Sequence, residues 1–167
     1  TKSPPPPFIT STLQQSGISK LRVGAQHIMS IAQKLYENGY ITYMRTDSIN
    51  LSDEALKASR FEIENLYGKD YLPEKSITYK NKVKNAQEAH EAIRPAGSRF
   101  VHPDKLKSKL DEKEFKLYQL IWSRTIACQM KSAKLLTTQV NIKNNDFMFL
   151  AKGKTIKFDG FLKVYQE

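Results

Sequence analysis

The sequence has a single cysteine and no long apolar run, and each shortage excludes a class of structure. Cys128 has no partner, so neither an internal disulfide nor a zinc site built on paired thiolates can form. No stretch approaches the roughly 18 to 20 consecutive apolar residues of a membrane-spanning helix, and the first residues lack the layout of a signal peptide. We therefore expect a soluble protein of a reducing, cytoplasmic compartment, with no membrane partner.

Acidic residues are also in short supply. Asp and Glu number 17 against 27 Lys and Arg, which leaves a net charge of +10. An excess of that size favours a polyanionic partner such as nucleic acid. No Asp-x-Asp motif occurs, and His27, His90 and His102 lack the Glu-x-x-His or Cys-x-x-Cys spacing of metal sites. The sequence therefore predicts no metal ligands within this chain.

The 167 residues, of which 40% are hydrophobic, suffice for one domain and part of another. The chain begins at Thr1 without a Met and stops soon after an apolar run, so we expect a piece of a longer protein.

Periodic apolar residues and capping signals predict helices over about the first 130 residues. Ser11 and Gln14 match a capping box, and the helix that starts near Ala25 should end at Gly39. Two further helices are expected after cap residues. One follows Ser52, with Leu56, Ile63 and Leu66 facing inward, and ends at Gly68; a long one follows Asp111, after a shorter helix with Leu106 and Leu110.

Beyond Met130 the apolar period changes from helical to alternating. Residues 136–142 and 147–151 alternate in this way, with Asn144 and Asn145 as a turn between them. Residues 131–167 are therefore expected to be antiparallel strands of a sheet that this chain cannot complete. The predicted fold class is mainly α with a β segment.

The stretch from 39 to 48, Gly-Tyr-Ile-Thr-Tyr-Met-Arg-Thr-Asp-Ser, combines a possible nucleophile with an anion clamp. A phenol has a reference pKa of about 10 and attacks a phosphodiester only with a nearby cation. In an extended segment Arg45 would project from the same face as Tyr43, and its guanidinium stays charged. The alternative interpretation is an ordinary strand at Tyr40 to Tyr43 that leads into a polar turn.

Three neighbouring polar residues could support such a site. Thr46 and Ser48 could donate hydrogen bonds to the backbone of a bound strand, and Asp47 could hold Arg45 or cap a helix.

Residues 41–48, Ile-Thr-Tyr-Met-Arg-Thr-Asp-Ser, closely resemble the active-site signature of type IA DNA topoisomerases. A methionine at the fourth position of this signature, here Met44, resembles the bacterial topoisomerase I branch of the family. The resemblance continues in consistent order along the chain. It includes Pro-Phe-Ile-Thr-Ser-Thr-Leu-Gln-Gln at 7–15, Ile-Ala-Gln-Lys-Leu-Tyr-Glu at 31–37, Glu-Ala-His-Glu-Ala-Ile-Arg-Pro at 88–95, Leu-Tyr-Gln-Leu-Ile-Trp at 117–122 and Ala-Cys-Gln-Met at 127–130.

The resemblance implies specific roles. Tyr43 would attack one DNA strand and form a 5′-phosphotyrosyl link, assisted by Arg45. His90 would contact the phosphate near the break, and Arg94 would support that site. Residues 3–130 would form a helical domain that carries the active-site tyrosine and a helix-turn-helix-like unit, and residues 131–167 would be a return segment of a β-rich arch domain.

The resemblance also implies parts that this chain lacks. In type IA enzymes a separate acidic Toprim domain holds Mg²⁺, so the metal is expected elsewhere in the parent chain. The expected partners are that chain and DNA, especially single-stranded or negatively supercoiled DNA at the bacterial nucleoid. The chain alone would be inactive.

Several features stay open between two interpretations. The lysines between 105 and 116 fit a DNA track or a solvated helix face, and Trp122 fits base stacking or, more readily, core packing. The first two helices, with the extended segment after them, also resemble a helix-turn-helix, so a DNA-binding module without chemistry is the alternative function.

Overall fold

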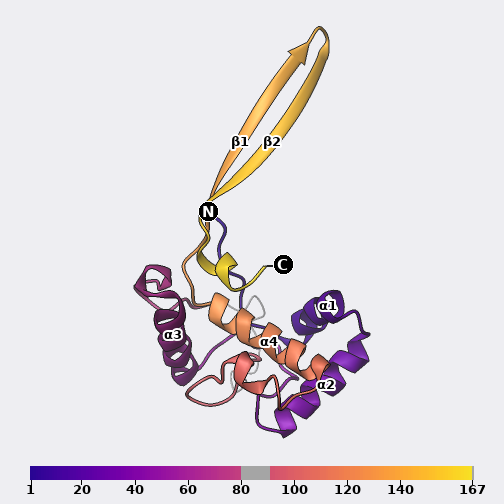
Figure 1. The fold of residues 1–167 in the computed structure, drawn as a ribbon, viewed down its shortest axis with the longest axis vertical. Helices are drawn as coiled ribbons and strands as arrows, with labels where there is room; N and C mark the ends of the chain where they lie inside the picture. The colour runs from indigo at the N-terminus through magenta and orange to yellow at the C-terminus, as the bar shows by residue number, and fades with distance from the viewer. Residues whose placement is uncertain (80–90, 167) are drawn as a thin grey trace.

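The computed structural model describes residues 1–79 and 91–166 (Figure 1). Four α-helices and one antiparallel hairpin make up the regular structure of these residues, so the expected mainly α fold with a β segment is confirmed. The elements are α1 (Thr10–Leu21), α2 (Ala25–Glu37), α3 (Asp53–Tyr67), α4 (Glu112–Ala127), β1 (Lys134–Asn144) and β2 (Phe147–Phe158), with short 3₁₀ turns at Lys69–Tyr71, Pro103–Leu106 and Gly160–Lys163.

Helix α2 ends as predicted, at a glycine in the left-handed region. Gly39 has a φ of 74°, which only a residue without a Cβ adopts at little cost. Its N–H donates to Tyr36 O at 2.9 Å, and the Tyr40 N–H donates to Leu35 O at 2.8 Å. This pair of bonds satisfies the last carbonyls of the helix and turns the chain sharply toward Tyr43.

Helix α1 begins two residues earlier than predicted. Thr10 is its first residue and Ile9, in an extended conformation, is the residue before it, so Ser11 lies inside the helix rather than at its cap. The free Ile9 N–H donates to Thr12 Oγ1 at 3.1 Å. The predicted capping box at Ser11 is therefore wrong, because Thr12 supplies the capping oxygen from within the first turn.

The caps of α3 and α4 are confirmed. Ser52 Oγ accepts from the Ala55 N–H at 3.3 Å. Asp111 Oδ1 accepts from the Glu114 N–H at 2.8 Å, and Glu114 Oε2 accepts from the Asp111 N–H at 3.1 Å, which is a reciprocal capping box. Before α4, where a short helix through Leu106 and Leu110 was predicted, the structure has the 3₁₀ turn Pro103–Leu106.

Helix α4 runs through the middle of the helical body, and the other helices pack around it (Figure 1). Trp122 is buried in this core, as its position on the apolar face predicts. Leu66 was predicted to face inward, but it is 45% exposed, because it lies in the last turn of α3, outside the buried face of that helix. The buried residues of α3 are Ala55, Ala58, Ser59 and Ile63.

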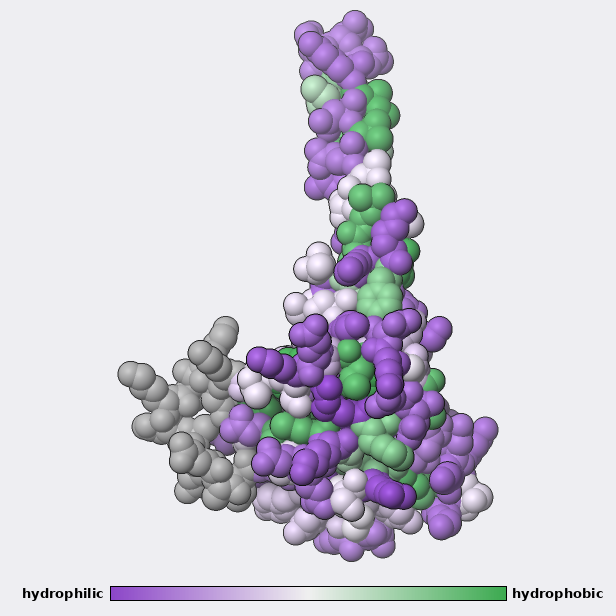
Figure 2. Space-filling view, turned by 90° about the vertical axis from the view of Figure 1, so that its left-hand side faces the viewer, coloured by the Kyte–Doolittle hydropathy of each residue, from purple (hydrophilic) through white to green (hydrophobic). Residues whose placement is uncertain are grey.

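The two strands form a hairpin that projects away from the helical body (Figure 1). Asn144 pairs with Phe147, and Asn145 takes the positive φ of 52° that the tight turn needs. Nearly every hairpin side chain is exposed, including the apolar ones that appear green along it in Figure 2. The predicted strands are therefore confirmed, and both faces of the hairpin lack cover from the described residues.

After the hairpin the chain returns to the helices. Phe161 and Tyr165 are buried in the same core as α4, and the Tyr165 hydroxyl accepts from Arg124 Nη1 at 2.9 Å. The predicted domain boundary at residue 130 stays a prediction, but the 160–165 segment packs with the helical body.

Candidate active site

The segment from 40 to 48 connects α2 and α3 without joining a β-strand among the described residues; Ile41 forms only an isolated bridge with Pro95. From Tyr43 onward exposed and buried side chains alternate. The exposed residues are Tyr43, Arg45 and Asp47, and the buried ones are Met44, Thr46 and Ser48. Tyr43 is 42% exposed. The alternation brings Tyr43 and Arg45 to the solvent side of one extended loop, as their spacing predicts.

On the N-terminal side of Tyr43, the hydroxyl of Thr42 joins the loop to the 92–94 segment. Thr42 Oγ1 donates to Ala92 O at 2.8 Å and accepts from the Arg94 N–H at 3.0 Å. The Thr42 N–H also donates to Arg94 O at 2.9 Å. The residue before the tyrosine is thus held by three hydrogen bonds to a segment 50 residues away along the chain.

On the C-terminal side, Thr10 makes an equivalent connection from the start of α1. Its Oγ1 donates to Met44 O at 2.8 Å and accepts from the Thr46 N–H at 2.9 Å. Its own N–H donates to Thr46 O at 3.0 Å. The main chain on both sides of Tyr43 is therefore bound to parts of the chain that are distant in sequence.

The Tyr43 ring itself contacts a second tyrosine. Its centroid lies 5.3 Å from that of Tyr36, in the last turns of α2, and the ring planes are inclined by 68°. Such edge-to-face contact favours one orientation of the two rings. Tyr36 is 41% exposed, so the pair presents two phenols on the surface.

Next to this loop, the buried side chain of Arg94 makes several hydrogen bonds. Its Nε and Nη2 donate to the Glu91 carboxylate at 2.8 and 2.9 Å, and its Nη1 donates to Pro95 O at 2.9 Å and Gly97 O at 3.1 Å. Glu91 Oε1 also accepts from the Ser52 N–H at 2.7 Å. Burial by itself would raise the pKa of Glu91, but the hydrogen bonds from Arg94 and Ser52 outweigh it and lower that pKa below its ordinary value.

An open pocket of about 470 Å³ lies beside the loop where α1 begins. The first turn of α1 carries no acidic residue, so its free N–H groups favour an anion. Arg45 contributes a positive charge to the pocket wall, and Asp47 contributes a negative one. The lining residues are Ile9, Thr10, Ser11, Gln14, Arg45, Thr46 and Asp47.

Comparisons with known proteins show which family has this sequence and fold. Residues 1–167 match the DNA topoisomerase family. The chain belongs to that family. DNA topoisomerase 1 of Streptomyces coelicolor is 56% identical over 171 residues, and that of Mycobacterium leprae is 52% identical over 171 residues; these alignments cover 99% and 100% of this chain but 18% of each relative. The chain thus spans about a fifth of the length of these relatives.

A solved topoisomerase structure agrees. Full-length topoisomerase I from Thermotoga maritima has a TM-score of 0.83 and 36% identity to this chain, covering 99% of it and 28% of that structure. The resemblance to bacterial topoisomerase I that the motifs predict is therefore confirmed.

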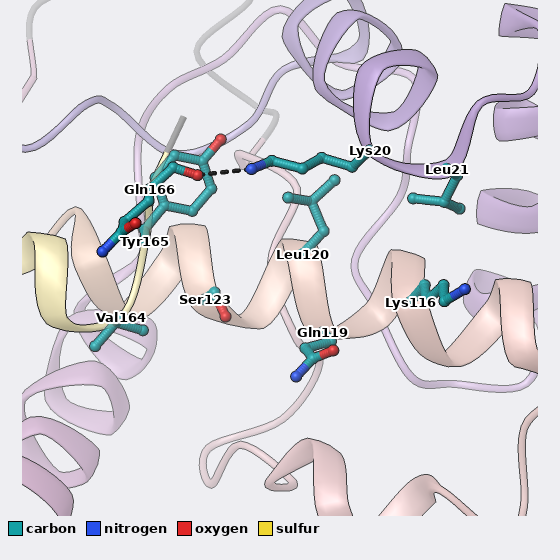
Figure 3. Close-up of a pocket in the computed structure, with 9 residues that line it drawn as sticks. All are labelled: Lys20, Leu21, Lys116, Gln119, Leu120, Ser123, Val164, Tyr165 and Gln166. Carbon is teal, nitrogen blue, oxygen red and sulfur yellow. Dashed lines mark hydrogen bonds between the residues drawn. The ribbon is translucent and has the colours of Figure 1, made fainter.

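The predicted site residues lie apart from another pocket of the structure. That pocket, of about 390 Å³, lies between α4, the end of α1 and the C-terminal segment, where Lys20 Nζ donates to Gln166 O at 2.7 Å (Figure 3). None of the predicted site residues lines it. The candidate site is therefore the surface around Tyr43 and not this pocket.

Of the other site residues predicted for a topoisomerase, several are already engaged within the protein. Thr46 Oγ1 accepts from the Ser48 N–H at 3.1 Å, and Ser48 Oγ accepts from the Asn50 N–H at 3.2 Å, so both hydroxyls shape the loop. Between the described residues no ion pair joins Asp47 to Arg45. His90 lies outside the described residues.

Thr10, Thr42, Tyr36 and Glu91 are site residues that sequence reasoning did not single out. Each lies in a quoted topoisomerase motif. The partners of Thr10 and Thr42 are distant in sequence, whereas Tyr36 contacts Tyr43 and Glu91 binds Arg94, which are close to them along the chain. In residues 1–79 and 91–166, no three His, Cys, Asp or Glu side chains converge as a metal site would require. None of the helices in these ranges is long and apolar enough to span a bilayer.

Proposed function

We propose that this chain carries the nucleophile of a type IA DNA topoisomerase, acting as part of a longer protein. The Tyr43 phenolic oxygen forms a bond to the phosphorus of one DNA strand and gives up its proton. The 3′-oxygen leaves and becomes a free hydroxyl, while the 5′-phosphate stays on the tyrosine. One phosphoester bond replaces another, so the reverse step reseals the strand without ATP, and strand passage between the two steps relaxes negatively supercoiled DNA.

The exposed Tyr43 phenol in a firmly anchored loop carries this proposal. A reacting group has to be both accessible to a DNA strand and held in place. Arg45, exposed two residues further on, provides forked donors for the phosphate oxygens as their charge grows. The pocket at the start of α1 gives the adjacent phosphates of the strand a favourable environment.

The partner is DNA that is locally single-stranded, because one strand has to reach the loop. The net charge of +10 favours this partner. His90 contacts the phosphate near the break, and Thr46 and Ser48 support the loop beneath it. Acidic residues of another part of the longer protein would hold magnesium, which would neutralise phosphate charge. The protein acts in the bacterial cytoplasm, at the nucleoid.

Covalent trapping tests the proposal. The full-length protein that contains this chain is mixed with Mg²⁺ and a single-stranded oligonucleotide, and then denatured. A 3′-end label should stay on the protein and a 5′-end label should be released, since the link is to the 5′-phosphate. The labelled peptide should contain Tyr43. Adduct formation by Tyr43→Phe would refute the assignment, and Tyr40→Phe, which alters the tyrosine nearest to it along the sequence, should form the adduct normally.

Two further results distinguish an enzyme from a DNA-binding module without chemistry. Arg45→Ala should slow cleavage more than it weakens binding. The 167-residue chain alone should bind single-stranded DNA weakly, in a salt-dependent way, and should not relax plasmid. A helix-turn-helix-like binder would give no adduct from the full-length protein.

A further inference from the structure

We propose that Thr10 and Thr42 are positioning residues that fix the reactive oxygen of Tyr43; this inference rests on the proposed function. The two hydroxyls bind the main chain on opposite sides of the tyrosine. Thr42 precedes it directly, and Thr10 holds Met44 and Thr46 after it.

Each hydroxyl is used as both donor and acceptor. Thr42 Oγ1 donates to Ala92 O and accepts from the Arg94 N–H. Thr10 Oγ1 donates to Met44 O and accepts from the Thr46 N–H. In a loop that belongs to no strand, these bonds replace the regular ladder that would otherwise set the position of the main chain.

The buried apolar residues of the loop cannot fix the position of its main chain as closely as these hydrogen bonds do. Ile41 and Met44 are buried on either side of Tyr43, but apolar packing is non-directional, whereas hydrogen bonds prefer narrow ranges of distance and angle. Tyr43 is 42% exposed, and the edge-on contact with Tyr36 is the ring contact that supports it from the side. The place of the phenolic oxygen therefore depends on where the main chain of residue 43 is held.

Position matters strongly for this chemistry. An attacking oxygen has to approach phosphorus in line, and a misplacement of about 1 Å costs on the order of 100-fold in rate. Binding of the strand, in contrast, is spread over many phosphate contacts and tolerates a small shift of one residue. Loss of either threonine hydroxyl should therefore reduce the rate of cleavage and leave affinity for DNA nearly unchanged.

The test uses Thr10→Val and Thr42→Val in the full-length protein, with serine variants of both. Valine keeps the shape and removes the hydroxyl, whereas serine restores it. Thr125→Val is the matched control, because this buried threonine also donates a hydroxyl hydrogen bond, to Ile121 O at 2.9 Å within α4. Single-turnover cleavage, oligonucleotide affinity without Mg²⁺ and thermal unfolding are measured for each.

We expect the valine variants to cleave about 10- to 100-fold more slowly, with affinity within about twofold of wild type and serine restoring most of the rate. Thr125→Val should lower the melting temperature without this loss. Wild-type cleavage rates in folded valine variants would overturn the inference, as would an equal rate loss in Thr125→Val or a failure of serine to restore the rate. If one valine variant unfolds, the other carries the test. A wild-type protein without a Tyr43 adduct would instead refute the proposed function.

Discussion

Replacing Arg94 by alanine would remove a guanidinium whose five N–H donors are all used inside the protein. Two bonds go to the Glu91 carboxylate at 2.8 and 2.9 Å, and two go to the carbonyls of Pro95 and Gly97 at 2.9 and 3.1 Å. The fifth is a longer one to Ser52 Oγ at 3.5 Å. No donor is left for a DNA phosphate in this conformation.

The expected loss of stability in Arg94→Ala follows from the burial of the ion pair between Arg94 and Glu91. The Arg94 side chain is 6% exposed and that of Glu91 is 25% exposed. Removing one partner of a buried ion pair costs about 3 to 5 kcal/mol, and the partial exposure of the carboxylate places this pair at the lower end. We therefore expect Arg94→Ala to lower the free energy of unfolding by about 3 kcal/mol.

Urea unfolding of the 167-residue chain measures this loss, and a double-mutant cycle with Glu91→Ala separates the pair from its surroundings. DNA binding is measured on the same variants as a function of salt. Each single-strand phosphate contact contributes about 0.7 to the slope of log affinity against log salt. Arg94→Ala should leave that slope unchanged, whereas the exposed control Arg45→Ala should reduce it.

The opposite pattern would refute this reasoning. If Arg94→Ala changed the free energy of unfolding by less than about 0.5 kcal/mol and reduced the salt slope, its guanidinium would be a DNA contact rather than an internal clamp.

Three further predictions concern stability. The pKa of Glu91 is lowered in the folded state, so its stabilising contribution is complete above the ordinary Glu pKa of 4.5 and is lost as the pH falls through the pKa of the folded state. The urea midpoint of the wild type should therefore fall more steeply on acidification than that of Glu91→Gln. Gly160 has a φ of 51°, and a Cβ there would lie 2.5 Å from a main-chain oxygen. Gly160→Ala should therefore lower the free energy of unfolding in urea by about 1 to 3 kcal/mol. Gly153 has open space around it, so Gly153→Ala should change this free energy little. Phe8 is fully buried and Phe149 is 56% exposed. Phe8→Ala should lower the free energy of unfolding by about 3 to 5 kcal/mol and Phe149→Ala by less than about 1, and equal losses would contradict the observed core.

Local sequence signals predicted much of this fold because helices and hairpins depend on residues that are close along the chain. The end of α2 at Gly39 and the start of α4 at Asp111 follow from contacts within five residues. The alternation that exposes Tyr43 and Arg45 follows from the geometry of an extended chain. The same motif predicted the family, and the comparisons confirmed it.

The tertiary structure alone decided which distant segments meet at this loop. Thr42 binds residues 50 and 52 positions away, and Thr10 binds residues 34 and 36 positions away. For Arg94 the motif predicts a residue that supports phosphate binding, whereas in the structure its guanidinium binds Glu91, Pro95 O and Gly97 O, which all lie within three residues of it. Of the residues that the structure describes, only Ser52 joins these groups from a distant part of the chain. Local periodicity records which face of an element is apolar, but the partner of a polar group depends on how the elements pack together, and no short stretch of sequence contains that information.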